Sequence, residues 1–86
     1  ITTLKSGTHW SDELLRLIDR ADVFQLFWSK TAAESPYVKQ EWEHALQYED
    51  ARPNFIRPVW WEDPMPTVPD ELRHIHFWHQ PDLDDA

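Results

Sequence analysis

The chain has 86 residues, of which 41% are hydrophobic and 14% aromatic, and its sixteen Asp and Glu outnumber eight Lys and Arg to give a net charge of −8. This length allows one small domain, and the hydrophobic fraction predicts a packed core and not a disordered chain. The acidic balance argues against nucleic acid or an anionic membrane as a partner, and the lack of cysteine excludes disulfides and Cys-based zinc sites.

The first part of the chain predicts a loop, a helix and a strand. Residues 1–9 contain the single glycine among Thr, Lys and Ser, which favours a loop. Ser11 is suited to cap a helix that ends with Arg16 and Arg20, as the helix dipole favours. The apolar stripe of that helix comprises Trp10, Leu14, Leu17, Ile18 and Ala21. Residues 23–28 are a nearly continuous apolar run rich in β formers, which predicts a buried strand of a parallel sheet.

The most informative stretch is residues 35–46, which predicts the central helix. Ser35 is a good N-cap, and Pro36 fits the first helical position, where its missing N–H costs nothing. Apolar residues then recur at the spacing of one buried helical stripe, formed by Val38, Trp42, Ala45 and Leu46.

A second stripe of this helix carries a candidate for chemistry. Tyr37, Glu41, His44 and Tyr48 follow one another at helical spacing, so Glu41 lies beside the apolar stripe and one turn after an aromatic ring. A carboxylate at the edge of a buried stripe is a candidate catalytic group. The alternative is a solvated glutamate that pairs with lysine, and spacing alone favours that alternative. Glu43 lies about 200° round the helix from Glu41 and is expected to be solvated.

The rest of the chain continues the alternation of helices and strands. Residues 50–54 predict a turn, 55–60 a second strand in which Pro58 is expected to stop or bulge the ladder, and 61–69 a proline-rich loop. A short helix at 69–72, a last strand at 75–78 and a loose acidic tail at 81–86 follow. This order predicts an α/β fold with a parallel sheet and right-handed crossovers. Three such strands leave sheet edges uncovered, so we expect further strands before this segment and interpret 1–86 as one partial domain.

The ordered motifs resemble a Toll/interleukin-1 receptor (TIR) domain of bacterial type. The resemblance runs from about Gly7 to about Phe77 and covers the later part of the family's fold, with residues 5–7 at the end of the so-called BB loop. Four segments carry it, namely residues 7–10, 22–29, 35–46 and 55–60 together with the last strand near His76. It implies a flavodoxin-like parallel sheet with helices on both faces, here without its N-terminal strands.

The resemblance also implies a function. Many bacterial and plant members cleave NAD⁺ after self-assembly, in signalling or in anti-phage and immune-type defence, and the family's catalytic glutamate falls on Glu41 of this sequence. Other members are non-catalytic scaffolds that act through TIR–TIR contacts, so this second function stays open. Either function implies a cytoplasmic homo-oligomer with other TIR domains as partners. The enzymatic function also implies NAD⁺ as a substrate and no bound cofactor.

Four further residues are candidates for substrate contact. Tyr37 could stack on a ring one turn before Glu41, and Trp60 and Trp61 precede the loop where TIR enzymes often place an aromatic side chain against the substrate. Ser29 ends the first strand, at the sheet edge where α/β proteins bind ligands. Core packing for both tryptophans and a capping role for Ser29 are the alternatives.

The histidines and the tryptophan content suggest two further sites, which the sequence does not favour. His74 and His76 would share one face of a strand, with His79 nearby, but no carboxylate completes a familiar metal-ligand spacing, so we predict no metal site. Most tryptophans fall on core stripes, which argues against a sugar-stacking surface.

Overall fold

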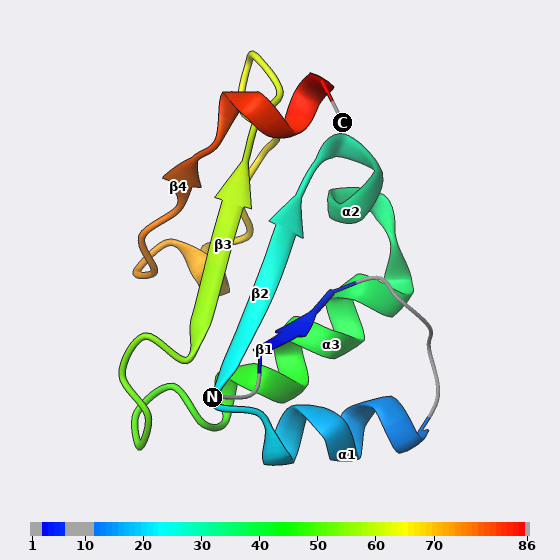
Figure 1. Ribbon diagram of the computed structural model, residues 1–86, viewed down its shortest axis with the longest axis vertical. Helices are drawn as coiled ribbons and strands as arrows, with labels where there is room; N and C mark the ends of the chain where they lie inside the picture. The colour runs from blue at the N-terminus through cyan, green and yellow to red at the C-terminus, as the bar shows by residue number, and fades with distance from the viewer. Residues whose placement is uncertain (1–2, 7–11, 86) are drawn as a thin grey trace.

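The computed structural model describes residues 3–6 and 12–85, with a parallel sheet and helices between its strands (Figure 1). In chain order the strands are β1 (Thr3–Lys5), β2 (Val23–Trp28), β3 (Ile56–Trp60) and β4 (Trp78–His79). They lie side by side in this same order, and every pair of neighbours is parallel. The predicted α/β fold with a flavodoxin-like parallel sheet is therefore confirmed.

Three α-helices and two 3₁₀ helices connect the strands. They are α1 (Asp12–Arg20), α2 (Lys30–Glu34), α3 (Pro36–Leu46), η1 (Asp70–Leu72) and η2 (Pro81–Asp85). α1 contacts α3, and α3 contacts β3, so the two longer helices form one layer beside the sheet. η2 lies in the acidic tail, where the sequence predicts no regular structure.

Local sequence explains where α2 and α3 begin. The Ser35 hydroxyl accepts a hydrogen bond of 3.2 Å from the Val38 amide, and Pro36 occupies the first turn, as predicted. Ser29 caps α2 in the same way, since its hydroxyl accepts a hydrogen bond of 3.1 Å from the Ala32 amide. The sequence offered this capping role for Ser29 but did not predict the helix at residues 30–34. The two serine caps allow the chain to start two helices within eight residues of the end of β2.

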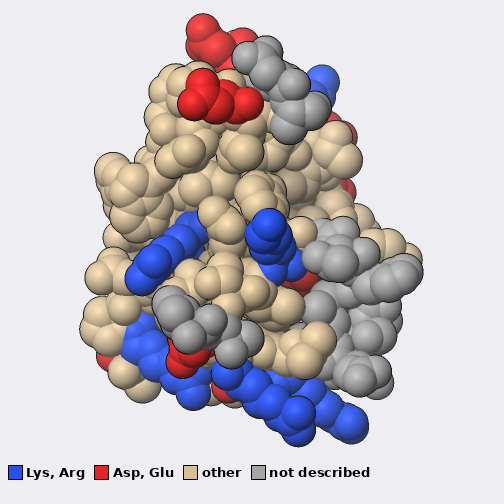
Figure 2. All heavy atoms as spheres, in the orientation of Figure 1, with Lys and Arg blue, Asp and Glu red and all other residues tan. Residues whose placement is uncertain are grey.

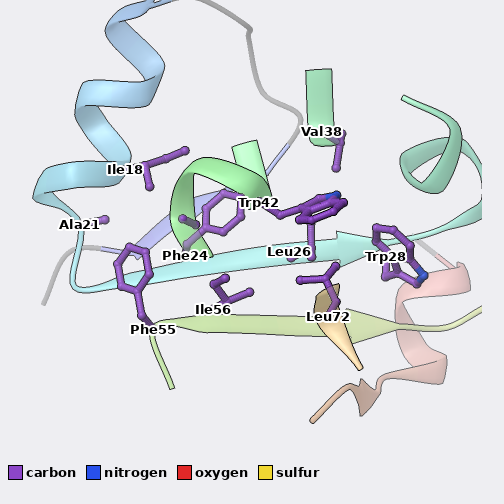
Figure 3. Close-up of a cluster of buried hydrophobic side chains, with 11 residues drawn as sticks. Ile18, Ala21, Phe24, Leu26, Trp28, Val38, Trp42, Phe55, Ile56 and Leu72 are labelled. Atoms are coloured by element: carbon purple, nitrogen blue, oxygen red, sulfur yellow. The ribbon is translucent and has the colours of Figure 1, made fainter. Parts of the chain in front are cut away.

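The core lies between β2, β3 and the helices (Figure 3). Alternate side chains of β2 point toward α3, namely Phe24, Leu26 and Trp28, each at most 1% exposed. Val38 and Trp42 meet them from α3, which confirms the apolar stripe predicted for this helix. The other members of the buried cluster come from α1, α3, β3 and η1 or lie directly beside α1 and β3: Ile18, Ala21, Ala45, Phe55, Ile56 and Leu72.

Several further local predictions are wrong. β1 is a strand where a loop was expected, and its three residues pair with Val23, Phe24 and Gln25 of β2. Pro58 neither stops nor bulges β3, because the ladder with β2 passes through it in register with Leu26 and β4 pairs only beyond it.

Two of these errors concern the last strand and the apolar stripe of α1, in which Leu17 was expected to be buried. The last strand is the dipeptide at 78–79 and not 75–78, because Ile75 and Phe77 pack against the core from a loop. Leu17 of α1 is 44% exposed, and Leu15 packs partly against the core. Gly7, Trp10 and Ser11 lie outside the described residues, so the predictions for them are not tested. The same holds for the prediction that the Leu14 side chain is buried.

Trp42→Ala is expected to lower the free energy of unfolding by about 3–5 kcal/mol, because Trp42 is 2% exposed and its removal leaves a cavity between α3 and β2. Leu17→Ala, on an exposed position of α1, is the control and should cost less than about 1 kcal/mol. Urea denaturation followed by fluorescence and circular dichroism measures both. A loss for Trp42→Ala as small as that of the control would contradict the packing of α3.

Candidate active site

The residues of the second stripe of α3 differ in solvent exposure. Tyr37 in the first turn is 58% exposed, whereas Glu41, one turn later, is 1% exposed. His44 and Tyr48 are intermediate. The solvated alternative for Glu41 is therefore wrong, while Glu43 is exposed as predicted.

A buried carboxylate is costly, because an ion loses its hydration when it enters a low-dielectric interior. Glu41 is the charged residue among the buried side chains of the described part of the chain. It has an interaction partner, and no buried side-chain nitrogen or oxygen atom of the described residues lacks a hydrogen bond. Packing alone would be served as well by an apolar residue, so this position has a requirement beyond filling space.

A cluster of polar side chains joins α1 to α3 just beyond Glu41. The Asp19 carboxylate accepts a hydrogen bond from the Tyr48 hydroxyl at 2.5 Å, and the same oxygen lies 2.6 Å from His44 Nε2. The Gln47 amide lies 3.2 Å from His44 Nδ1, so the imidazole proton on Nε2 points to Asp19. Because Asp19 is 25 and 29 residues from these partners, the cluster fixes the relative position of the two helices.

Arg52 extends this cluster to the loop that follows α3. Its Nη1 donates to the backbone carbonyl of Asp19 in the last turn of α1, at 3.3 Å, and to that of Ala21 just after the helix, at 3.1 Å. Its guanidinium also lies over the rings of Tyr48 and Phe55, 4.9 and 5.6 Å from their centroids. One arginine therefore links the end of α1, the end of α3 and the approach to β3.

These contacts set the pKa values of Asp19 and Tyr48. Hydrogen bonds from Tyr48 and then His44 lower the pKa of the Asp19 carboxyl below its ordinary value of 3.8, because they favour the charged form. The same bond to Asp19 raises the pKa of Tyr48 above 10, because the neutral hydroxyl donates its proton to a carboxylate.

The structure places the remaining predicted site residues apart from one another. Ser29 caps α2, which is the alternative that the sequence left open. Trp60 packs against the core and stacks on His79 with 4.1 Å between ring centroids. The Trp61 ring meets the edge of Phe27, 6.4 Å between centroids, and Phe27 alternates with Leu26 and so lies on the face of β2 that points away from α3. Glu41 and Trp61 are thus on opposite sides of the sheet.

A groove lies elsewhere, at the carboxyl ends of β2 and β3. It has a volume of about 800 Å³ and lies between α2 and the proline-rich loop of residues 61–69. None of the five residues predicted for catalysis or substrate contact lines it. The sequence signal that could have located it is the loop of three prolines directly after a strand, since such ends of parallel strands commonly bind ligands.

The histidines near β4 pack on aromatic rings. His76 meets Trp78 edge-on at 4.7 Å between centroids, and His79 stacks on Trp60. Within residues 3–6 and 12–85, no three His, Asp or Glu side chains are grouped so that they could hold a metal ion. The described residues also contain no helix that is both long and apolar enough to cross a bilayer.

Comparison with known protein families identifies the family of this chain. The family model of the TIR domain matches residues 1–86. The chain belongs to the TIR domain family. No curated protein and no solved structure matches the sequence. Membership supports a role of this TIR domain in signalling or in contacts with other TIR domains.

The sequence resemblance to the family is thus confirmed, and the structure adds the cluster of Asp19, His44 and Tyr48, which sequence reasoning missed. The available signal was the helical spacing that puts His44 and Tyr48 on the stripe of Glu41. It could not name their partner on α1, because nothing in the local sequence brings α1 beside that stripe.

The free energy of unfolding of the TIR domain is expected to fall in acid. The fall should be smaller in the variant Tyr48→Phe, because this variant lacks the hydrogen bond from the Tyr48 hydroxyl to Asp19. A lowered pKa means that Asp19 stabilises the fold above the pKa of the unfolded chain and loses this effect as pH falls through its folded pKa. The stability difference between the two proteins should therefore be larger at pH 7 than at pH 2–3. Urea denaturation midpoints at both pH values measure it. A difference that does not change with pH would contradict the assigned bond.

Proposed function

We propose that this TIR domain hydrolyses NAD⁺ at the bond between nicotinamide and ribose, with Glu41 as the catalytic residue. The observation that carries the proposal is the burial of the Glu41 carboxylate, 1% exposed, at the position to which the sequence resemblance assigns a catalytic glutamate. Perturbed and costly charges of this kind gather at functional sites. The match of the chain to the family adds independent support.

The chemistry needs one carboxylate and little acid assistance. The nicotinamide of NAD⁺ is cationic, so when the bond from C1′ of ribose to the ring nitrogen breaks, the electron pair neutralises the leaving ring. The ribose that remains has oxocarbenium character, and a nearby carboxylate stabilises that positive charge. Water then adds to C1′ and releases a proton, which leaves ADP-ribose and nicotinamide. A carboxylate in a poorly solvated setting stabilises the cation more than one in water.

The burial of Glu41 gives the proposal a second component. A carboxylate that is 1% exposed cannot touch a substrate, so the site must open before the reaction. Contacts with other TIR domains could supply the energy for that opening, and activity would then rise with assembly. NAD⁺ consumption is therefore expected to depend on protein concentration. The proposal places the domain in the cytoplasm, as a homo-oligomer that uses NAD⁺ and needs no bound cofactor.

Tyr37 is the best supported of the substrate-contact residues. It lies one turn before Glu41 on the same stripe and is 58% exposed, so its ring could stack on nicotinamide or adenine once Glu41 is accessible. Trp61 lies across the sheet from α3 and could contact a substrate only in a neighbouring subunit. Ser29 and Trp60 are less favoured, because one caps α2 and the other packs on the core.

A non-catalytic TIR scaffold is the second candidate function. The observation in its favour is that no predicted substrate residue lines the groove of the described structure, and that Glu41 is already covered. In that case the domain would act in signalling through TIR–TIR contacts alone.

NAD⁺ consumption across a protein concentration series, in the complete protein that carries this domain, tests the proposal. Glu41→Gln keeps the side-chain shape but removes the charge, and is expected to lower the rate by at least about 100-fold. Glu43→Gln, an exposed position of the same helix, is the matched control and should retain the wild-type rate. Circular dichroism and light scattering verify that each variant is folded and assembled.

The outcomes separate the two functions. A rate that rises more steeply than protein concentration, and that is lost only in Glu41→Gln, supports the enzyme. If folded, assembled wild-type protein consumes no NAD⁺, the non-catalytic scaffold function is favoured. Equal rates in wild type and Glu41→Gln would mean that another group performs the chemistry.

A further inference from the structure

The groove at the carboxyl ends of β2 and β3 is a second feature that needs a function. We call it the acidic groove, and its walls are α2 with Lys30, Ala33 and Glu34 and the loop with Glu62, Asp63 and Met65. Its volume of about 800 Å³ is within the range of ligand pockets. Glu41 does not line it, so whatever it holds is independent of the proposed NAD⁺ chemistry.

Two long-range hydrogen bonds fix the walls of the groove. The Lys30 amide donates to Glu62 Oε1 at 2.6 Å, which joins α2 to the loop. The indole Nε1 of Trp28 donates to the Pro66 carbonyl at 3.3 Å, and Trp28 itself is 1% exposed in the core. The loop is therefore anchored at two points, and a ligand would find the groove already formed, with little ordering cost.

The lining of the groove combines apolar and acidic side chains. Ala33, Met65 and the loop prolines supply an apolar surface, and methionine adapts to varied partners. Three carboxylates lie around it against one lysine. The ion pairs within 4.0 Å among described residues join His44 to Asp19 and Arg73 to Asp70, so neither neutralises the groove.

The charge of the whole molecule reinforces that of the groove. In Figure 2 the most prominent acidic side chains lie at the upper end of the face shown, where Figure 1 places η2 and the loop after β3, and most Lys and Arg side chains of this face lie in its middle and lower part. The net charge of −8 adds a long-range attraction for cations.

We propose that the acidic groove binds a basic peptide segment of a partner protein, with arginine or lysine side chains next to small apolar residues. The aliphatic stem of such a side chain would pack on Met65 and the prolines, while its charged end would reach the carboxylates of Glu34 and Asp63. Arginine suits this arrangement best, because its guanidinium can form paired hydrogen bonds with a carboxylate.

NMR titration of the ¹⁵N-labelled full-length chain with the peptide Gly-Arg-Ala-Arg-Gly, blocked at both ends, tests the proposal at low salt. The peptide should shift the amide signals of Lys30 and of residues 62, 63, 65 and 67, and the same peptide with Gln in place of Arg should not. Raising the salt concentration should weaken binding, since the carboxylates that line the groove are partly exposed.

Substitutions separate the groove from general electrostatics. Glu34→Gln with Asp63→Asn is expected to weaken binding about tenfold, as two partly exposed ion pairs allow. Glu43→Gln with Asp50→Asn changes the net charge by the same two units at exposed positions outside the groove and should weaken binding less than about twofold. Lys30→Gln removes the competing cation and should tighten binding.

Three results would overturn the proposal. One is the absence of any shift in the groove amides at millimolar peptide. The second is equal weakening in the two double variants, which would mean that only the overall charge attracts the peptide. The third is concentration-dependent self-association that is lost in Glu34→Gln with Asp63→Asn while the peptide does not bind, which would make a second copy of this chain the occupant.

Discussion

The packing of α3 across β2 and β3 is the contact on which the rest of the structure depends. Val38, Trp42 and Ala45 from one stripe of this helix close the core over Phe24 and Leu26 of β2. Because the apolar stripe is fixed against the sheet, the neighbouring stripe of α3 must face sideways, toward α1. The positions of Glu41, His44 and Tyr48 follow from that rotation of the helix.

The neighbouring stripe shows how a small domain accommodates charge. His44 and Tyr48 both satisfy the Asp19 carboxylate at the junction of two helices, and Arg52 donates to the backbone carbonyl of the same residue. Glu41 lies one turn before His44 on this stripe and is the more deeply buried acid. Tight fastening of α1 to α3 next to Glu41 implies that any opening of Glu41 must work against these hydrogen bonds.

The two candidate surfaces of this TIR domain have different physical origins. Glu41 belongs to the helix layer, whereas the acidic groove belongs to the end of the sheet, where β2 continues into α2 and β3 into a proline-rich loop. The groove depends on bonds between residues 28 and 66 and between 30 and 62, which lie far apart in sequence. A domain of this kind could therefore bind a partner at one site without occupying the other.

The sequence by itself determined the elements whose signals are local. The serine cap, Pro36 and the apolar spacing specify α3, and the continuous apolar run specifies β2, because helix caps and side-chain periodicity act over a few residues. The order of elements and the TIR motifs then define the fold. Only the tertiary structure decided the burial of Glu41, the partners of Asp19, the strand at 3–5 and the uninterrupted ladder through Pro58. Each of these depends on a segment more than fifteen residues away, and local spacing carries no information about such a neighbour.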